Sequence, residues 1–243
     1  MKDSKFEKLN KKNIQLMSND SLLVKKTNDW VQHAWKYQYP YHFTWLGRPI
    51  IQFPQDIIAL QEIIWKTKPE LIIETGIARG GSIIFSASLL ELMGKGKVVG
   101  IDIDIRSENK KEIEKHPLSH RIVIIEGSSV QKKVINQINK IAKNKKRILI
   151  ILDSDHSEKH VLKELNSYSH LIKKGGYLIV CDTFVEEMPK GFFKDRNWNK
   201  GNNPKTAIKK FLKTNDRFKI DHSVDKKLLI TACSSGFLKC IKN

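Results

Sequence analysis

Acidic side chains stand at the ends of two apolar segments of this sequence, and one of them is followed by a histidine. The segment 147–156, RILIILDSDH, contains Asp153 and ends in His156, and the segment 175–184, GGYLIVCDTF, contains Asp182. Continuous apolar runs are typical of buried parallel strands, whose carboxyl ends form the active-site edge of an open α/β sheet. In one interpretation Asp153 and Asp182 share a hard divalent cation whose shell is completed by water. In the other, each carboxylate caps the helix that follows it.

A glycine-rich turn lies in the stretch LIIETGIARGGS (71–82). Its apolar run stops at Glu74, passes Gly76 and Gly81, and enters a helical pattern, as at the start of cofactor-binding α/β domains. The spacing is neither the dinucleotide G-x-G-x-x-G nor a P-loop, which requires Lys and Ser/Thr after the glycines. An acid at the strand end suits a positively charged ligand such as S-adenosylmethionine better than a pyrophosphate. The alternative is a structural turn with an incidental acid.

Two further strand ends carry polar groups. The segment 97–104, KVVGIDID, contains Asp102 at the second-strand position where a carboxylate binds both ribose hydroxyls of a cofactor. The segment 121–129, RIVIIEGSS, ends in small polar residues, of which Ser128 suits an adenine edge and Ser129 is at least as well suited to helix capping. Cofactor-binding groups are therefore expected along one edge of the sheet.

These side chains meet only if their segments are parallel strands of one sheet. Helical patterns alternate with the strands, and the segments 217–223 and 228–241 resemble an antiparallel edge pair. The sequence therefore predicts an α/β fold: a Rossmann-like, doubly wound sheet, mostly parallel with an antiparallel C-terminal hairpin, as in class I methyltransferases. The stretch 185–204 is rich in Gly, Asn and Pro and is expected to form a loop or lid.

Residues 1–50 are expected to form a helical, aromatic-rich N-terminal extension, and residues 51–243 the cofactor-binding domain. The aromatic cluster of the extension consists of Trp30, Trp35, Tyr37, Tyr39, Tyr41, Phe43 and Trp45. Such a cluster caps the core or lines a substrate mouth, and the first is the more common arrangement. It also offers an assembly surface, and we expect a homo-oligomer.

Composition indicates a globular protein of the cytoplasm. Of the 243 residues, 40% are hydrophobic and 29% charged, and no apolar run approaches the roughly 20 residues of a membrane span. The N-terminus lacks the apolar core of a signal peptide. Three cysteines without CxxC spacing indicate neither a disulfide framework nor a zinc site.

The formal net charge of +18 has two interpretations. In the first, lysine replaces other polar residues over the whole surface. In the second, the charge attracts an anionic, membrane-associated substrate to peripheral contact. No RNP, helix-turn-helix or zinc-finger signature accompanies the charge, so nucleic acid is not expected as a partner.

From about residue 40 to its C-terminus the sequence resembles the cephalosporin hydroxylase/rhamnosyl O-methyltransferase family. The matching segments are WLGRPIIQFPQDI, LIIETGIARGGS, VVGIDIDIR, EGSS, LDSDH, DTFVEEMP and GNNPKTA. The resemblance implies the S-adenosylmethionine-dependent methyltransferase fold and O-methyl transfer assisted by a divalent ion, usually Mg²⁺. It also implies a role in lipid or polysaccharide biosynthesis.

Carried onto this sequence, the family pattern assigns a site residue by residue. The implied cofactor-binding residues are Glu74, Gly76, Gly81, Ser82, Asp102, Ser128 and Asp153. Asp153 and Asp182 match metal ligands, and His156 matches the base that related catechol-type enzymes place three residues after the first metal aspartate. One departure is Cys181, which stands where metal-binding members have an acid, and a thiol is a poor Mg²⁺ ligand. Either Asp155 or Glu186 supplements the ion's ligands, or the ion is absent.

The function expected on this basis is methyl transfer from S-adenosylmethionine to a hydroxyl, of a sugar in a polysaccharide or glycolipid, with His156 and Asp153 as catalytic residues. A metal at Asp153 and Asp182 would lower the pKa of that hydroxyl. Two alternatives stay open: an oxygenase, which needs iron on two His and one carboxylate, and a non-catalytic protein that binds glycan or nucleic acid.

Overall fold

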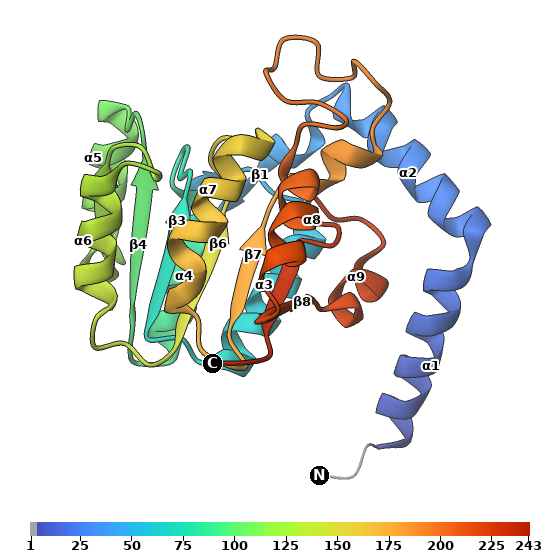
Figure 1. The fold of residues 1–243 in the computed structure, drawn as a ribbon, viewed down its shortest axis with the longest axis horizontal. Coiled ribbons are helices and arrows are strands. Elements are labelled where there is room, and N and C mark those ends of the chain that lie inside the picture. Colours follow the sequence, from blue (N-terminus) through green and yellow to red (C-terminus); the bar gives the residue numbers. More distant parts are fainter. Residues whose placement is uncertain (1–3) are drawn as a thin grey trace.

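The apolar segments form one sheet at the centre of the molecule. The computed structural model describes residues 4–243, and its main sheet has seven strands in the order β5-β4-β3-β6-β7-β9-β8 (Figure 1). The parallel strands are β3 (Leu71–Thr75), β4 (Lys97–Asp102), β5 (Ile122–Glu126), β6 (Ile148–Leu152) and β7 (Tyr177–Val180). Two further strands, β8 (Phe218–Ile220) and β9 (Phe237–Cys240), pair antiparallel with each other, and β9 pairs antiparallel with β7.

Helices cover both faces of the sheet, and each face has its own core. One face packs against α3 (Pro54–Thr67), α4 (Gly81–Leu92) and α5 (Ser107–Lys115), the other against α6 (Lys132–Ala142), α7 (Glu158–Tyr168) and α8 (Pro204–Thr214). Successive residues of a strand enter opposite cores, as Ile72 and Ile73 of β3 do. Every residue of β3 and β6 is therefore buried. The predicted doubly wound α/β class is confirmed.

The C-terminal part differs from the predicted hairpin. The antiparallel pair exists, but α9 (His222–Leu228) separates its strands and β9 lies between β7 and β8. Residues 229–236, expected to belong to the second strand, are irregular. Their path has a physical cause: the buried Asp56 of α3 accepts hydrogen bonds from Thr231 Oγ1 and Ala232 N. These bonds hold the segment against α3 rather than in the sheet.

The N-terminal residues form an arm and a small hairpin. The arm consists of α1 (Lys5–Asn19) and α2 (Ser21–Trp35) and runs along one side of the body (Figure 1). A two-stranded sheet of β1 (Phe43–Trp45) and β2 (Arg48–Ile50) then packs on α4, with the Trp45 ring 4.9 Å from that of Phe85. A division into an extension and a domain at residue 50 stays a prediction.

Short 3-10 helices complete the chain: η1 (Tyr39–His42), η2 (Ser119–Arg121), η3 (Ser169–Leu171) and η4 (Thr183–Glu187). Between η4 and α8 lies the expected irregular loop, residues 188–203. Glu186 holds this loop by accepting hydrogen bonds from Gly201 N (2.8 Å) and Asn203 Nδ2 (2.5 Å). Within residues 4–243, no helix combines the length and apolarity needed to cross a membrane.

The turn between β3 and α4 needs glycine for two reasons. Gly76 has a φ of +79°, which side-chain-bearing residues rarely adopt, and a Cβ atom there would lie 2.1 Å from the carbonyl oxygen of Asp153. A Cβ on Gly81 would lie 2.2 Å from the carbonyl oxygen of Pro49. The first glycine thus lets the turn pass directly against the end of β6, and the second lets β2 touch the start of α4.

We predict that Gly76→Ala lowers the free energy of unfolding by about 2–4 kcal/mol, since backbone strain and a clash with Asp153 add. Gly94→Ala is the matched control, because Gly94 also has a positive φ (+71°) but nothing within 4 Å of a new Cβ. It should cost only about 1 kcal/mol. Urea unfolding of both variants measures the difference, and equal losses would show that the Asp153 contact carries no weight.

Candidate active site

A pocket of about 720 Å³ opens at the carboxyl ends of the parallel strands. Its walls come from the turns after β3, β4, β5, β6 and β7, from the N-terminal segment 35–41 and from the loop 188–203. The predicted residues among its lining are Gly76, Gly81, Ser82, Asp102, Ser128, Asp153, His156 and Asp182. Glu74 is not among the lining residues and is buried.

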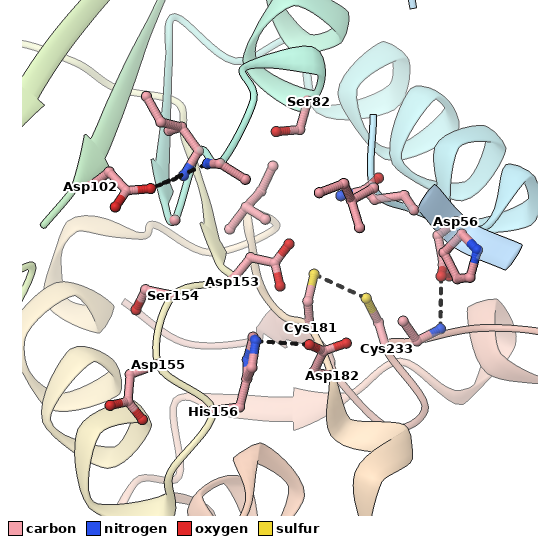
Figure 2. A pocket seen from close by; sticks show the side chains of 18 of the residues that line it. Asp56, Ser82, Asp102, Asp153, Ser154, Asp155, His156, Cys181, Asp182 and Cys233 are labelled. Atoms are coloured by element: carbon pink, nitrogen blue, oxygen red, sulfur yellow. Dashed lines mark hydrogen bonds and ion pairs between the residues drawn. The ribbon is translucent and has the colours of Figure 1, made fainter. Parts of the chain in front are cut away.

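Asp153, His156 and Asp182 form one cluster (Figure 2). β6 and β7 are adjacent parallel strands, so the residues that follow them meet at the same edge. One ligand atom from each of the three side chains lies within 4.8 Å of the others, and His156 Nε2 is 2.9 Å from Asp182 Oδ2. The structure therefore brings together the three residues that the sequence singled out for metal binding and proton transfer.

Burial and charge set the protonation of this cluster. Burial, together with the carboxylates of Asp182 and Glu74, raises the pKa of Asp153 well above its ordinary value. Burial alone would lower the pKa of His156, but the Asp182 carboxylate outweighs it, and the pKa of His156 is raised. The cluster thus holds close acidic groups that are partly buried, where added positive charge is favourable.

The capping interpretation of these aspartates does not describe the structure. Asp182 precedes η4, but its side chain makes no capping hydrogen bond, and the residue before α7 is Ser157. Asp155 is instead the structural acid, because its carboxylate accepts a hydrogen bond from Ser157 N at 2.7 Å. The Glu186 carboxylate is engaged in hydrogen bonds with the loop 188–203. Neither Asp155 nor Glu186 joins the cluster.

The surroundings of Cys181 do not suit a metal ligand. Its thiol is hydrogen-bonded to the thiol of Cys233, with 3.1 Å between the sulfur atoms (Figure 2). This contact, added to burial, raises the pKa of Cys181 well above its ordinary value, so the group stays a thiol. Where metal-binding members have an acid, this chain thus has a neutral thiol, Cys181, that forms part of the pocket wall.

The remaining donors fit a divalent cation. Two carboxylates suit Mg²⁺, which prefers oxygen ligands, and a bound cation would relieve the repulsion that raises the pKa of Asp153. Mg²⁺ does not require the imidazole of His156 as a ligand, so that ring is left to exchange a proton.

Asp102 shapes the glycine turn from the neighbouring strand. Its Oδ2 accepts hydrogen bonds from the backbone N–H groups of Ile77 (2.9 Å) and Ala78 (3.2 Å), as Figure 2 shows. Its Oδ1 accepts a longer bond from Asp104 N at 3.3 Å. The predicted ribose-binding acid therefore fixes the turn with one oxygen, and the residue lines the pocket.

Glu74 acts on the pocket through Ser82. The Ser82 hydroxyl donates a short hydrogen bond to Glu74 Oε1, while Oε2 is buried without a partner in the described chain. Burial raises the pKa of Glu74 to about 7, and the bond from Ser82 only partly opposes this. Direct contact between Glu74 and a ligand is thus not what the geometry favours, because Ser82 stands at the surface of the pocket.

Aromatic residues close the other end of the pocket. Trp35 and Tyr41 come from the N-terminal segment, and Phe193, Arg196 and Trp198 from the loop 188–203. The Trp198 ring lies 5.1 Å from that of His156, and the Arg196 guanidinium lies 5.7 Å from the Trp198 ring. Burial and the nearby carboxylates of Asp182 and Asp153 raise the pKa of Tyr41. Trp198 and Tyr41 therefore lie beside the cluster.

The N-terminal aromatic cluster contains both side chains that cap the core and side chains that line the pocket. Tyr39 packs its ring 6.2 Å from that of the buried Phe53, as a cap would. Trp35 packs 5.1 Å from Phe184 and also lines the pocket. Sequence reasoning missed Arg196 and Trp198, whose only signal was an aromatic and a cation inside a glycine- and asparagine-rich stretch.

Asp56 is a buried acid that the sequence did not single out. It lies in the first turn of α3, where acidic residues are common, and its carboxylate binds Thr231 and Ala232 at the pocket floor (Figure 2). Burial raises its pKa to about 7 although both hydrogen bonds lower it. No feature of the sequence distinguishes it from an ordinary helix-start acid.

Comparison with known proteins gives this site its context. The family model described as Rhamnosyl O-methyltransferase/CmcI matches residues 37–241. The chain belongs to this family. The resemblance stated from the sequence is thereby confirmed.

Members of the Rhamnosyl O-methyltransferase/CmcI family are similar over most of the chain. A rhamnosyl O-methyltransferase of Mycobacterium bovis (strain BCG / Pasteur 1173P2) is 30% identical over 209 residues, which is 80% of this chain and 77% of that protein. One of Mycobacterium leprae (strain TN) is 34% identical over 149 residues, or 60% of this chain and 62% of its own length. This second match therefore spans less than two thirds of the relative.

Solved structures of CmcI share the fold. An apo-structure has a TM-score of 0.58 at 18% identity and covers 84% of this chain and 78% of that one. A CmcI structure described as holding Mg and SAM has a TM-score of 0.58 at 17% identity and covers 83% of this chain and 77% of that one.

Replacing Asp56 by Asn tests the buried acid through the pH dependence of stability. The folded pKa of about 7 exceeds the ordinary 3.8, so the folded chain retains a proton that the unfolded chain releases. The stabilising contribution is full below pH 3.8 and is lost as the pH rises toward and through 7. Urea unfolding at a series of pH values gives the free energy of unfolding of each protein. Between pH 3.8 and 7 this free energy should fall more steeply with pH for wild type than for Asp56→Asn, by up to about 1.4 kcal/mol per pH unit. An equal pH dependence of the free energy of unfolding in the two proteins would contradict the assignment of Asp56 as a buried, protonated carboxyl.

Proposed function

We propose that this chain transfers a methyl group from S-adenosylmethionine to a sugar hydroxyl. It is an O-methyltransferase of the Rhamnosyl O-methyltransferase/CmcI family. The observation that carries the proposal is the Asp153–His156–Asp182 cluster, which lies in the same pocket as the glycine turn. In this proposal the donor and the acceptor bind on either side of a base and two carboxylates.

The donor belongs at the end of the pocket formed by the glycine turn. Ser82, Asp102 and Ser128 line that end and present hydroxyl and carboxylate oxygens. Oxygen acceptors suit the amino group and ribose hydroxyls of S-adenosylmethionine, which carries positive charge and no phosphate. Gly76 leaves the turn without a side chain against the backbone of Asp153, so Asp153 is the member of the cluster that lies next to this end of the pocket.

His156 is placed to handle the proton of the reaction. Transfer forms a bond between the methyl carbon and the acceptor oxygen, breaks the carbon–sulfur bond and releases the hydroxyl proton. A neutral His156 takes that proton, and the Asp182 carboxylate 2.9 Å away stabilises the imidazolium that forms. A divalent cation at Asp153 and Asp182 would supply Lewis acidity that lowers the pKa of the hydroxyl.

The acceptor belongs at the aromatic end, because the Trp198 ring packs against His156 and Tyr41 lies close to the carboxylates of the cluster. Aromatic faces pack against the apolar face of a pyranose ring while its hydroxyls bind polar groups. Relatives named rhamnosyl O-methyltransferases make a deoxy sugar in a glycolipid or polysaccharide the acceptor class we propose.

Other features of the chain stay predictions. Homo-oligomer formation and placement in the cytoplasm rest on the sequence, as does the expectation that nucleic acid is not a partner. An oxygenase is not supported, because the described cluster holds one histidine and two carboxylates rather than two histidines and one. The other histidine in reach, His160, contacts Ser129, Ser154 and Glu164 instead.

Calorimetric titration with S-adenosylmethionine and S-adenosylhomocysteine, with and without Mg²⁺, tests the proposed function directly. We expect both compounds to bind, because the residues of the glycine-turn end do not depend on the ion. Methyl transfer to p-nitrophenyl α-L-rhamnopyranoside should increase when Mg²⁺ is added. A folded protein that binds neither compound would rule out the proposal.

We predict that His156→Ala lowers kcat at least about 100-fold, the usual effect of losing a general base, and leaves S-adenosylhomocysteine affinity nearly unchanged. His170→Ala is the control, since His170 contacts Asn139 on the far side of α7. In wild type assayed without a divalent cation, the acid limb of kcat should lie above pH 6.5, because the Asp182 carboxylate raises the pKa of His156 and keeps it protonated to higher pH. Simultaneous loss of cofactor affinity would assign His156 a structural role.

A further inference from the structure

The first helix of the N-terminal arm, α1, contributes no residue to the lining of the methyltransferase pocket. The family match begins at residue 37, after the arm formed by α1 and α2 has ended. Figure 1 shows α1 along the side of the body, and none of its residues is buried. A helix this exposed gains little stability from packing on the body. The apolar side chains on its surface therefore need an explanation other than burial in the core.

One side of α1 carries an exposed apolar stripe of Phe6, Leu9 and Leu16. These side chains are 71%, 54% and 59% exposed. At 3.6 residues per turn they fall within an arc of about 80°. The contacts of α1 with the body lie elsewhere on the helix, where Gln15 accepts a hydrogen bond from Lys226 of α9. The stripe therefore faces away from the body.

Lysines lie along one edge of this apolar stripe. On the same helical wheel, Lys5 and Lys12 fall within about 40° of its edge, next to Leu16. The helix contains four lysines and one acid, Glu7. An apolar stripe bordered by lysines is the arrangement of helices that lie in the plane of a membrane surface, with ammonium groups reaching the headgroups.

We propose that α1 is a docking surface for the acidic phospholipids of a membrane. Phe6, Leu9 and Leu16 enter the headgroup–acyl boundary, and the adjacent lysines neutralise lipid phosphates. Charge argues against a second copy of the chain as the occupant, because every copy carries a net charge of +18 and lysines beside the stripe. The proposal is independent of the methyl-transfer reaction, although it would bring the pocket to acceptors held in a membrane.

The test is co-sedimentation of the full chain with vesicles of phosphatidylcholine alone or mixed equally with phosphatidylglycerol. We expect binding to the mixed vesicles only, weakening as salt is raised. The variant F6Q/L9Q/L16Q should bind about tenfold or more weakly, because it removes the apolar insertion. The control L92Q changes an apolar residue at the end of α4 that is 81% exposed, and should bind like wild type.

The charge contribution has its own variant, K5Q/K8Q/K12Q, which should weaken binding and flatten its salt dependence. Light scattering without lipid reports the oligomeric state of each protein. Absence of wild-type binding to the mixed vesicles, or equal binding by F6Q/L9Q/L16Q, would overturn the proposal. So would a change from oligomer to monomer in that variant, since it would assign the stripe to contacts between copies. Calorimetry with S-adenosylhomocysteine should be unchanged throughout, and its failure would bear on the methyltransferase alone.

Discussion

The central constraint on this molecule is the close placement of two partly buried carboxylates, Asp153 and Asp182, at one edge of a sheet. Removing such groups from water is unfavourable unless they gain hydrogen bonds or opposite charge. Here an imidazole pairs with Asp182 at 2.9 Å, while the pKa of Asp153 is raised. Parallel strands with covered faces supply the rigidity, because β6 and β7 fix the two positions through paired backbones. The chemistry therefore depends on a charge arrangement that only a well-packed sheet can maintain.

The glycine turn and the cluster are parts of one construction. Gly76 lies against the carbonyl of Asp153, and Asp102 holds the same turn through two backbone N–H groups. Three neighbouring strands, β4, β3 and β6, are thus tied together where the donor is proposed to bind. A displacement of the turn would move Asp153, because no side chain lies between them to absorb the change.

Much of this arrangement could be predicted from the sequence, and the reason lies in local patterns. Buried strands leave continuous apolar runs, so the ends of β3 to β7 and the polar residues beyond them were identified. The family resemblance added the roles of Asp102 and His156. Asp56 could not be found, because its partners Thr231 and Ala232 are far away in the chain and its position is ordinary for a helix start. The segment 229–236 was predicted as strand for the same reason: its apolar residues pack against α3, a tertiary contact that no local pattern encodes.

The position of β9 between β7 and β8 constrains the order in which the sheet can form while the chain is being translated. A polypeptide emerging from a ribosome presents β8 before β9, so β8 has no partner strand until the later segment arrives. The same segment brings Ala232 and Cys233 to the pocket, and Gly236 passes so close to Val180 that a Cβ would lie 2.1 Å from its carbonyl oxygen. The pocket wall is therefore completed only after residues 229–240 have been translated.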